Sequence, residues 1–197
     1  MPSPVAPTAP AGNVLRRFRR NRGGSAAVEF ALVAPVFFAL LFAIIETAIV
    51  FFAGQVLETI TQNSARVLMT GQAQSGLVAT CADPVSGAAL ACTQSTFKTY
   101  VCNQIPALFT CANLFVDVQS YGTSFGSVVI GSQIDAANNF ITAMNYNPGT
   151  SGQIVVVRLF YQWPLFVTGL GYNIANLAGS KRLLVATAAF QNEPYGP

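Results

Sequence analysis

Residues 30–53 read FALVAPVFFALLFAIIETAIVFFA, and Glu46 is the one charged side chain in this stretch. About 20 consecutive apolar residues in a helix cross the ~30 Å hydrocarbon core of a bilayer. A soluble core helix would be shorter and would carry a polar face. The apolar region of a secretory signal is also shorter, at about 7–15 residues. The stretch therefore predicts a transmembrane helix, with Pro35 near its start as membrane helices tolerate.

Charged residues on either side of this stretch predict its orientation. Five arginines precede it, whereas Arg66 is the one basic residue among the twenty that follow. Because positive charge stays on the cytoplasmic side, the N-terminus is expected in the cytoplasm and residues from about 54 onward outside. The pair Arg16-Arg17 also fits a twin-arginine export signal, for which the apolar stretch is too long. The five topology determinants are Arg16, Arg17, Arg19, Arg20 and Arg22.

The net charge of +3 belongs to this N-terminal block. Beyond residue 24 the chain has five basic and seven acidic side chains, a net charge of −2. A basic block can bind nucleic acid, but directly before an apolar span it more often fixes membrane orientation. We therefore expect the lipid bilayer as a partner and no nucleic acid.

Three segments are expected along the chain. Residues 1–24 are rich in Pro and Ala and then in Arg, which predicts a disordered, basic cytoplasmic leader. Residues 25–71 are predicted to form one long helix that holds the span at 30–53. After the span, apolar residues recur every three or four positions, and Gly71 is a helix stop signal. Residues 72–197 are expected to form an extracytoplasmic domain.

The outer segment mixes helical and strand patterns. A helix is predicted over 94–109 with a cap near Thr93 or Ser95, and a short helical turn over 135–144. Apolar runs and alternations predict three strands, at 114–121, 153–164 and 181–194. The fold class is therefore α+β, with a long N-terminal transmembrane helix and a small domain holding an antiparallel sheet of at least three strands.

Four cysteines lie on the predicted outer side, where an oxidising compartment favours disulfides. They allow three pairings, of which the nearest-neighbour pairing is favoured. Successive spacings of ten, nine and eight intervening residues do not resemble the CxxC pairs of zinc sites. No metal and no cofactor are expected. The favoured bridges are Cys81–Cys92 and Cys102–Cys111.

The composition argues against an enzyme. Histidine is absent, which excludes a Ser-His-Asp triad, a Cys-His dyad and an HExxH zinc site. Seven scattered acids and no Gly-rich phosphate loop leave little for a catalytic site. Asp117 and Asp135 would form a carboxylate pair only if the fold brought them together.

Two carboxylates interrupt the apolar helix. A charge facing lipid costs about 2.5–3.5 kcal/mol, so Glu29 needs compensation. If the chain were cut after Gly24, the new Ser25 ammonium of one subunit could pair with Glu29 of a neighbour and set the axial register. Otherwise Glu29 extends to the headgroups. Glu46 lies about 24 Å past Phe30 along a helix, where it either reaches water or contacts another helix.

Several stretches resemble a known family. Gly24, four residues and Glu29-Phe30 resemble the type IV prepilin cleavage motif. Residues 24–46, GSAAVEFALVAPVFFALLFAIIE, resemble the TadE/TadG pseudopilins of tight-adherence (Flp-type) pilus assembly. Residues 102–121, 147–166 and 188–195 also resemble TadE-like proteins.

This resemblance implies a pilin-like minor pseudopilin in the bacterial inner membrane, with its outer domain in the periplasm. A prepilin peptidase would cut between Gly24 and Ser25, and other pilus-assembly and pseudopilin subunits would be partners. The large outer domain favours an assembly, initiation or tip role over a filament subunit.

The alternative is an uncleaved single-pass anchor with an extracytoplasmic binding or adhesion domain. Aromatic side chains that could serve a binding face, although such side chains more often pack in a core, are Tyr121, Phe160, Tyr161 and Trp163.

Overall fold

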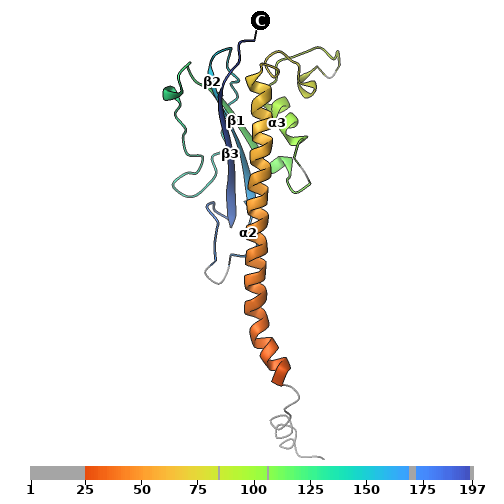
Figure 1. The fold of residues 1–197 in the computed structure, drawn as a ribbon, viewed down its shortest axis with the longest axis vertical. Helices are drawn as coiled ribbons and strands as arrows, with labels where there is room; N and C mark the ends of the chain where they lie inside the picture. Colours follow the sequence, from red (N-terminus) through yellow and green to blue (C-terminus); the bar gives the residue numbers. More distant parts are fainter. Residues whose placement is uncertain (1–24, 84, 106, 169–171, 196–197) are drawn as a thin grey trace, which may run out of the picture. The chain divides into compact units, whose positions relative to one another are not determined.

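The computed structural model describes residues 25–195 except 84, 106 and 169–171 (Figure 1). The chain divides into two units between Ala43 and Ile44. The predicted disordered leader, residues 1–24, lies outside the described residues. In chain order the elements are α2 (Ser25–Met69), η2 (Ala79–Cys81), α3 (Gln94–Cys102), η3 (Cys111–Asn113), β1 (Leu114–Ser120), η4 (Phe125–Ser127), β2 (Ile154–Pro164) and β3 (Lys181–Gln191).

The three strands form one antiparallel sheet with β2 in the centre. Leu114 of β1 pairs with Tyr161 of β2, and Ile154 of β2 pairs with Gln191 of β3. This confirms the predicted α+β class with a three-stranded antiparallel sheet. The strand predicted over 181–194 ends earlier, at Gln191, after which the chain turns back towards the end of α2.

The second half of α2 packs one face against this sheet. Its buried residues recur every three or four positions, as expected for a helix with one apolar stripe. On β2, alternate side chains point to the same layer because successive residues of a strand face opposite sides. The core between them holds Val50, Ala53, Leu57, Ile60 and Leu68 of α2 and Val155, Val157, Leu159, Tyr161 and Trp163 of β2.

The C-terminal end of α2 is fixed by the tail of the chain. The helix stops at Met69, and Gly71 adopts a left-handed backbone with φ of 74°. A side chain at Gly71 would collide with the ring of Tyr195, so both the backbone and the packing require glycine. The Glu193 amide donates to the Met69 carbonyl at 2.9 Å. The last described residues therefore cover the end of the helix.

The other face of the sheet holds a buried ion pair between cross-strand neighbours. Arg158 of β2 donates to the Asp117 carboxylate of β1 through Nη2 at 2.8 Å and Nε at 3.1 Å, and both residues are buried. The same carboxylate accepts from the Asn145 amide at 2.9 Å, and Arg158 Nη1 donates to the Gly131 carbonyl at 2.9 Å. A buried pair is tolerated when its remaining hydrogen-bonding groups are also satisfied, as here.

Helix α3 is shorter than the sequence predicted. It begins at Gln94 behind a capping box, in which the Thr93 side chain accepts from the Thr96 amide, as the cap prediction required. It ends at Cys102, not at Phe109. The sequence places Pro106 shortly after, and the residue before a proline disfavours helical backbone. The helix prediction beyond Cys102 is therefore wrong.

The helical turn predicted over 135–144 is also wrong. Asp135 Oδ1 accepts from the Ala137 amide at 2.9 Å and the Asn139 amide at 2.7 Å. This side chain offers the backbone an alternative to helical bonding, which is common for Asp in turns. The turn closes a bridge between Ile134 and Phe140. Hydrogen bonds from backbone amides, above all that of Asn139, hold the pKa of the exposed Asp135 carboxyl below its ordinary value.

Replacing Asp117 by alanine should lower the free energy of unfolding by about 3–5 kcal/mol, because the Arg158 charge would be left buried without its partner. The double variant Asp117→Leu/Arg158→Met should be much closer to the wild type, since it removes both charges. Denaturant unfolding of the detergent-solubilised chain, followed by Trp163 fluorescence, measures both. Equal destabilisation of the single and double variants would contradict this account.

Candidate membrane anchor and assembly site

The first part of α2 exposes apolar side chains on all sides. Val36, Phe37 and Phe38 are consecutive and are 60%, 56% and 42% exposed. Consecutive residues of a helix point about 100° apart, so these three face different directions. Within the described residues, α2 is the one helix long and apolar enough to cross a membrane. Such a surface suits a hydrocarbon environment better than water.

The N-terminal end of α2 carries the predicted register residues. Ser25 begins the helix, and Glu29 and Phe30 are both exposed. Residues four apart on a helix are neighbours on one face, so Ser25 and Glu29 lie one turn apart. Gly24 and the five leader arginines lie outside the described residues. The processing and register roles therefore remain predictions.

Glu46 has a partner that the sequence did not suggest. Its carboxylate accepts from the Phe166 amide at 2.5 Å and from the Val167 amide at 3.0 Å, and the side chain is 8% exposed. Both amides belong to the chain's own loop after β2. Next to it, Thr47 and Tyr172 are joined through their hydroxyl groups. Neither expectation for Glu46, contact with water or with another helix, describes this arrangement.

This contact bears on where a membrane span can end. Irregular backbone does not face hydrocarbon, because its polar groups would lose water without replacement. The loop at 165–167 lies against α2 at Glu46, which falls inside the predicted span 30–53. A span over residues 26–45 has about 20 residues and a length of about 30 Å, which is enough to cross a bilayer. It would end directly before the loop contact.

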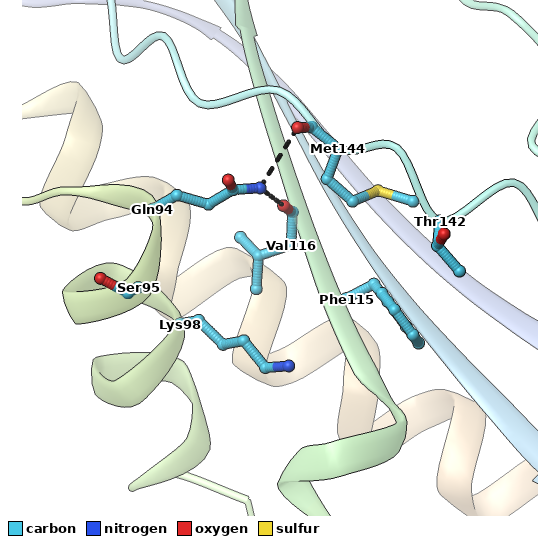
Figure 2. Close-up of a pocket in the computed structure, with 7 residues that line it drawn as sticks. All are labelled: Gln94, Ser95, Lys98, Phe115, Val116, Thr142 and Met144. Atoms are coloured by element: carbon cyan, nitrogen blue, oxygen red, sulfur yellow. Dashed lines mark hydrogen bonds between the residues drawn. The ribbon is translucent and has the colours of Figure 1, made fainter.

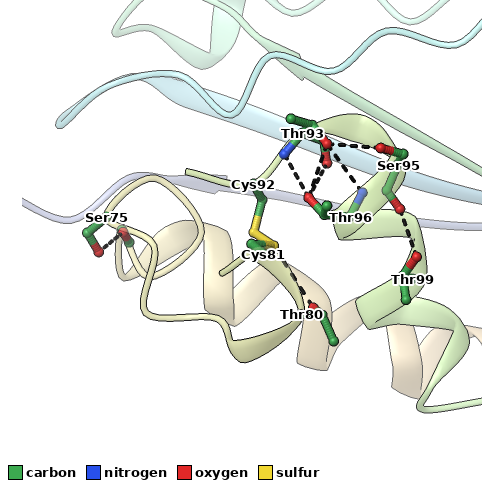
Figure 3. The surroundings of a disulfide bond; sticks show 9 residues. Ser75, Thr80, Cys81, Cys92, Thr93, Ser95, Thr96 and Thr99 are labelled. Carbon is green, nitrogen blue, oxygen red and sulfur yellow. Dashed lines mark hydrogen bonds between the residues drawn. A yellow bond between two sulfur atoms is a disulfide. The ribbon is translucent and has the colours of Figure 1, made fainter. Parts of the chain in front are cut away.

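Both disulfides connect nearest neighbours in sequence. Cys81 is bonded to Cys92, and Cys102 to Cys111, which is the pairing that the sequence favoured. Cys81 and Cys92 are buried in the core next to the α3 cap (Figure 3). The second bridge joins the end of α3 to the entrance of β1. The two bridges thus position α3 and the start of the sheet.

The domain has a hollow beside α3, but its lining has little catalytic chemistry. It has a volume of about 380 Å³ and lies between α3 and β1 (Figure 2). Lys98 is its one ionisable side chain, with Nζ 5.4 Å from the centre of the Phe115 ring. Gln94 spans it by donating to the Val116 and Met144 carbonyls. The lining therefore offers no acid–base pair.

The acids considered for a catalytic pair have separate structural tasks. Asp117 is buried in the ion pair with Arg158, whereas Asp135 holds an exposed turn. Among the described residues, no three His, Cys, Asp or Glu side chains form a cluster that could hold a metal ion.

The aromatic residues considered for a binding face serve mainly in packing. Phe160, Tyr161 and Trp163 are buried, and the Tyr161 ring lies edge-on to Phe109 with centres 4.8 Å apart. The Tyr161 hydroxyl accepts from the Thr110 amide at 3.0 Å. Tyr121 is partly exposed and donates to the Val129 carbonyl at 2.8 Å.

Residues 24–66 match the model of a protein family described as TadE-like protein. The matched segment runs from the residue before α2 to the last turn of that helix. The match confirms the resemblance to TadE-like proteins over residues 24–66. Comparisons with curated proteins and with solved structures gave no match.

Replacing Glu46 by alanine should free the loop amides without unfolding the domain. Hydrogen bonds to a charged group contribute about 1.5–3 kcal/mol, so exchange of the Phe166 and Val167 amides should accelerate at least about tenfold. Hydrogen exchange with mass spectrometry on the full chain in detergent measures this. Glu58→Gln, on the same helix, is the matched control. The Glu58 carboxylate accepts its hydrogen bond from the side chain of Gln62, one turn further along α2. Unchanged exchange in Glu46→Ala would show that the carboxylate does not hold the loop.

Proposed function

We propose, from the TadE-like character of residues 24–66, that this chain is a membrane-anchored minor pseudopilin that contributes to assembly of a Flp-type, tight-adherence pilus. The observation that carries the proposal is the coincidence of the family match with the exposed apolar surface of α2. The family is associated with pili and is structural rather than catalytic. The chain would act through helix association in the membrane and through its disulfide-bonded domain.

The charge distribution supports a location in the bacterial inner membrane with the N-terminus in the cytoplasm. Five arginines precede the apolar stretch 30–53 within residues 16–22, and Arg66 is the first basic residue after that stretch. The positive-inside rule then assigns the domain to the periplasm. Two disulfides in that domain agree with an oxidising compartment.

Assembly would proceed after cleavage by a prepilin peptidase between Gly24 and Ser25. Cleavage would create an ammonium group at Ser25, one helical turn before Glu29. In a bundle of parallel helices, Glu29 of one subunit would pair with the Ser25 ammonium of a neighbour, while Phe30 packs beside it. A charge pair in an apolar environment fixes the axial position of two helices, because any slip leaves both charges without a partner.

The size of the folded domain supports a minor or tip role. The unit that begins at Ile44 holds a three-stranded sheet, a core and two disulfides. This is a larger folded domain than a small filament subunit needs. The apolar side chains exposed between Val28 and Ile45 would contact lipid or the helices of other pilus-assembly subunits.

Intact-mass measurement of the protein recovered from membranes should give a chain that begins at Ser25. Gly24→Ala should block cleavage and leave the full-length chain. Glu29→Ala should be cleaved normally but lose co-purification with partner subunits, whereas Glu58→Gln serves as the control acid on the same helix. Full-length protein that persists and functions beside an active peptidase would favour the uncleaved anchor with a binding or adhesion domain.

A reporter fused after Pro197 should be active if it requires export and inactive if it requires the cytoplasm, because the positive-inside rule sends the C-terminal domain outward. Replacing the five leader arginines by glutamine should weaken this preference. A reporter that works only in the cytoplasm would refute the topology.

A further inference from the structure

The loop after β2 presents a large apolar side chain beside the point where α2 becomes exposed on all sides. Leu165 is buried, its amide donates to the Ser180 carbonyl at 3.0 Å, and Phe166 next to it is 86% exposed. The amides of Phe166 and Val167 are both satisfied by Glu46. The loop thus exposes an aromatic ring while its nearest polar backbone groups are turned inward to a carboxylate.

The two elements that hold this loop, α2 and β3, carry exposed apolar and basic side chains. Phe51 and Phe52, just beyond Glu46 on α2, are 70% and 60% exposed. Lys181 begins β3, pairs with Pro164 at the base of the loop and is exposed. A long basic side chain suits the zone where hydrocarbon meets the headgroups, because its apolar stem lies against hydrocarbon and its charged end reaches phosphate. The phenylalanine rings have no polar end and favour the apolar side of this zone.

The contact with Glu46 locates the loop at the end of the proposed span. The residues that precede Glu46 on α2 are those of the proposed span, so the loop contact lies where that span ends. A backbone loop at the edge of hydrocarbon needs its amides satisfied within the protein, and Glu46 does this for two successive residues.

We infer that the loop at residues 165–168 is a second membrane contact, in which Phe166 enters the outer headgroup region of the same bilayer that α2 spans. Lys181 lies at the same end of the sheet, within reach of lipid phosphates. This inference rests on the proposed membrane anchor. It adds to that anchor a folded element that contacts the lipid surface.

Fluorescence quenching by brominated lipids tests the inference on the full-length chain in vesicles of phosphatidylethanolamine and phosphatidylglycerol. Trp163→Phe removes the single tryptophan, and Phe166→Trp then places the probe in the loop. Phe125→Trp is the matched control, because Phe125 is also exposed, at 58%, and lies in η4, away from this loop in sequence. Phe37→Trp reports on the span. If the variants that lack Trp163 fold poorly, the same substitutions are made with Trp163 kept. Its buried indole then adds the same background fluorescence to every variant.

Lipids brominated close to the headgroup should quench Phe166→Trp at least about twofold more than Phe125→Trp, as for an aromatic ring at the interface. Phe37→Trp should be quenched best by lipids brominated deep in the acyl chains. Equal, weak quenching of Phe166→Trp and Phe125→Trp, with Phe37→Trp strongly quenched, would overturn the loop contact and leave the anchor standing. Weak quenching of Phe37→Trp would overturn the anchor and, with it, the loop contact.

Discussion

The packing of α2 on the central strand β2 is the contact on which the rest of the domain depends. From Val50 to Leu68 the helix buries one stripe in the sheet, while between Phe30 and Ile45 it is apolar on every side. The change follows from composition, since polar residues such as Gln55, Glu58 and Gln62 enter the sequence only after the apolar run. A single helix can therefore serve a membrane and a folded domain without a break in its hydrogen bonding.

Two disulfides and a buried ion pair hold the elements around this contact, in addition to the apolar core. The disulfides fix both ends of α3, and each contributes about 2–4 kcal/mol by restricting the unfolded chain. The ion pair of Asp117 and Arg158 ties β1 to β2 on the far face and reaches Asn145 and the Gly131 carbonyl in the covering loops. Irregular segments are thereby attached to the sheet through polar groups.

Sequence patterns predicted the elements that depend on local or repetitive signals. The apolar run, the alternation in β1 and β2 and the Thr93 cap each need only neighbouring residues to be recognised, and the structure contains all three. The early end of α3 has a local signal in Pro106, which the helix prediction over 94–109 did not use. What Glu46 contacts was not predictable from neighbouring residues. Glu46 bonds to amides 120 residues away in sequence, and backbone amides leave no trace in side-chain patterns. The turn at Asp135 was missed because its carboxylate competes with helical bonding.

The tail that covers the end of α2 has a consequence for when the domain can fold. Gly71 and Met69 contact Tyr195 and Glu193, and β3 completes the sheet beside β2. The packing of α2 in the domain is therefore complete only when residues 181–195 are in place. In the topology proposed above, the C-terminal end of α2 would complete its packing only after residues 181–195 had also crossed the membrane.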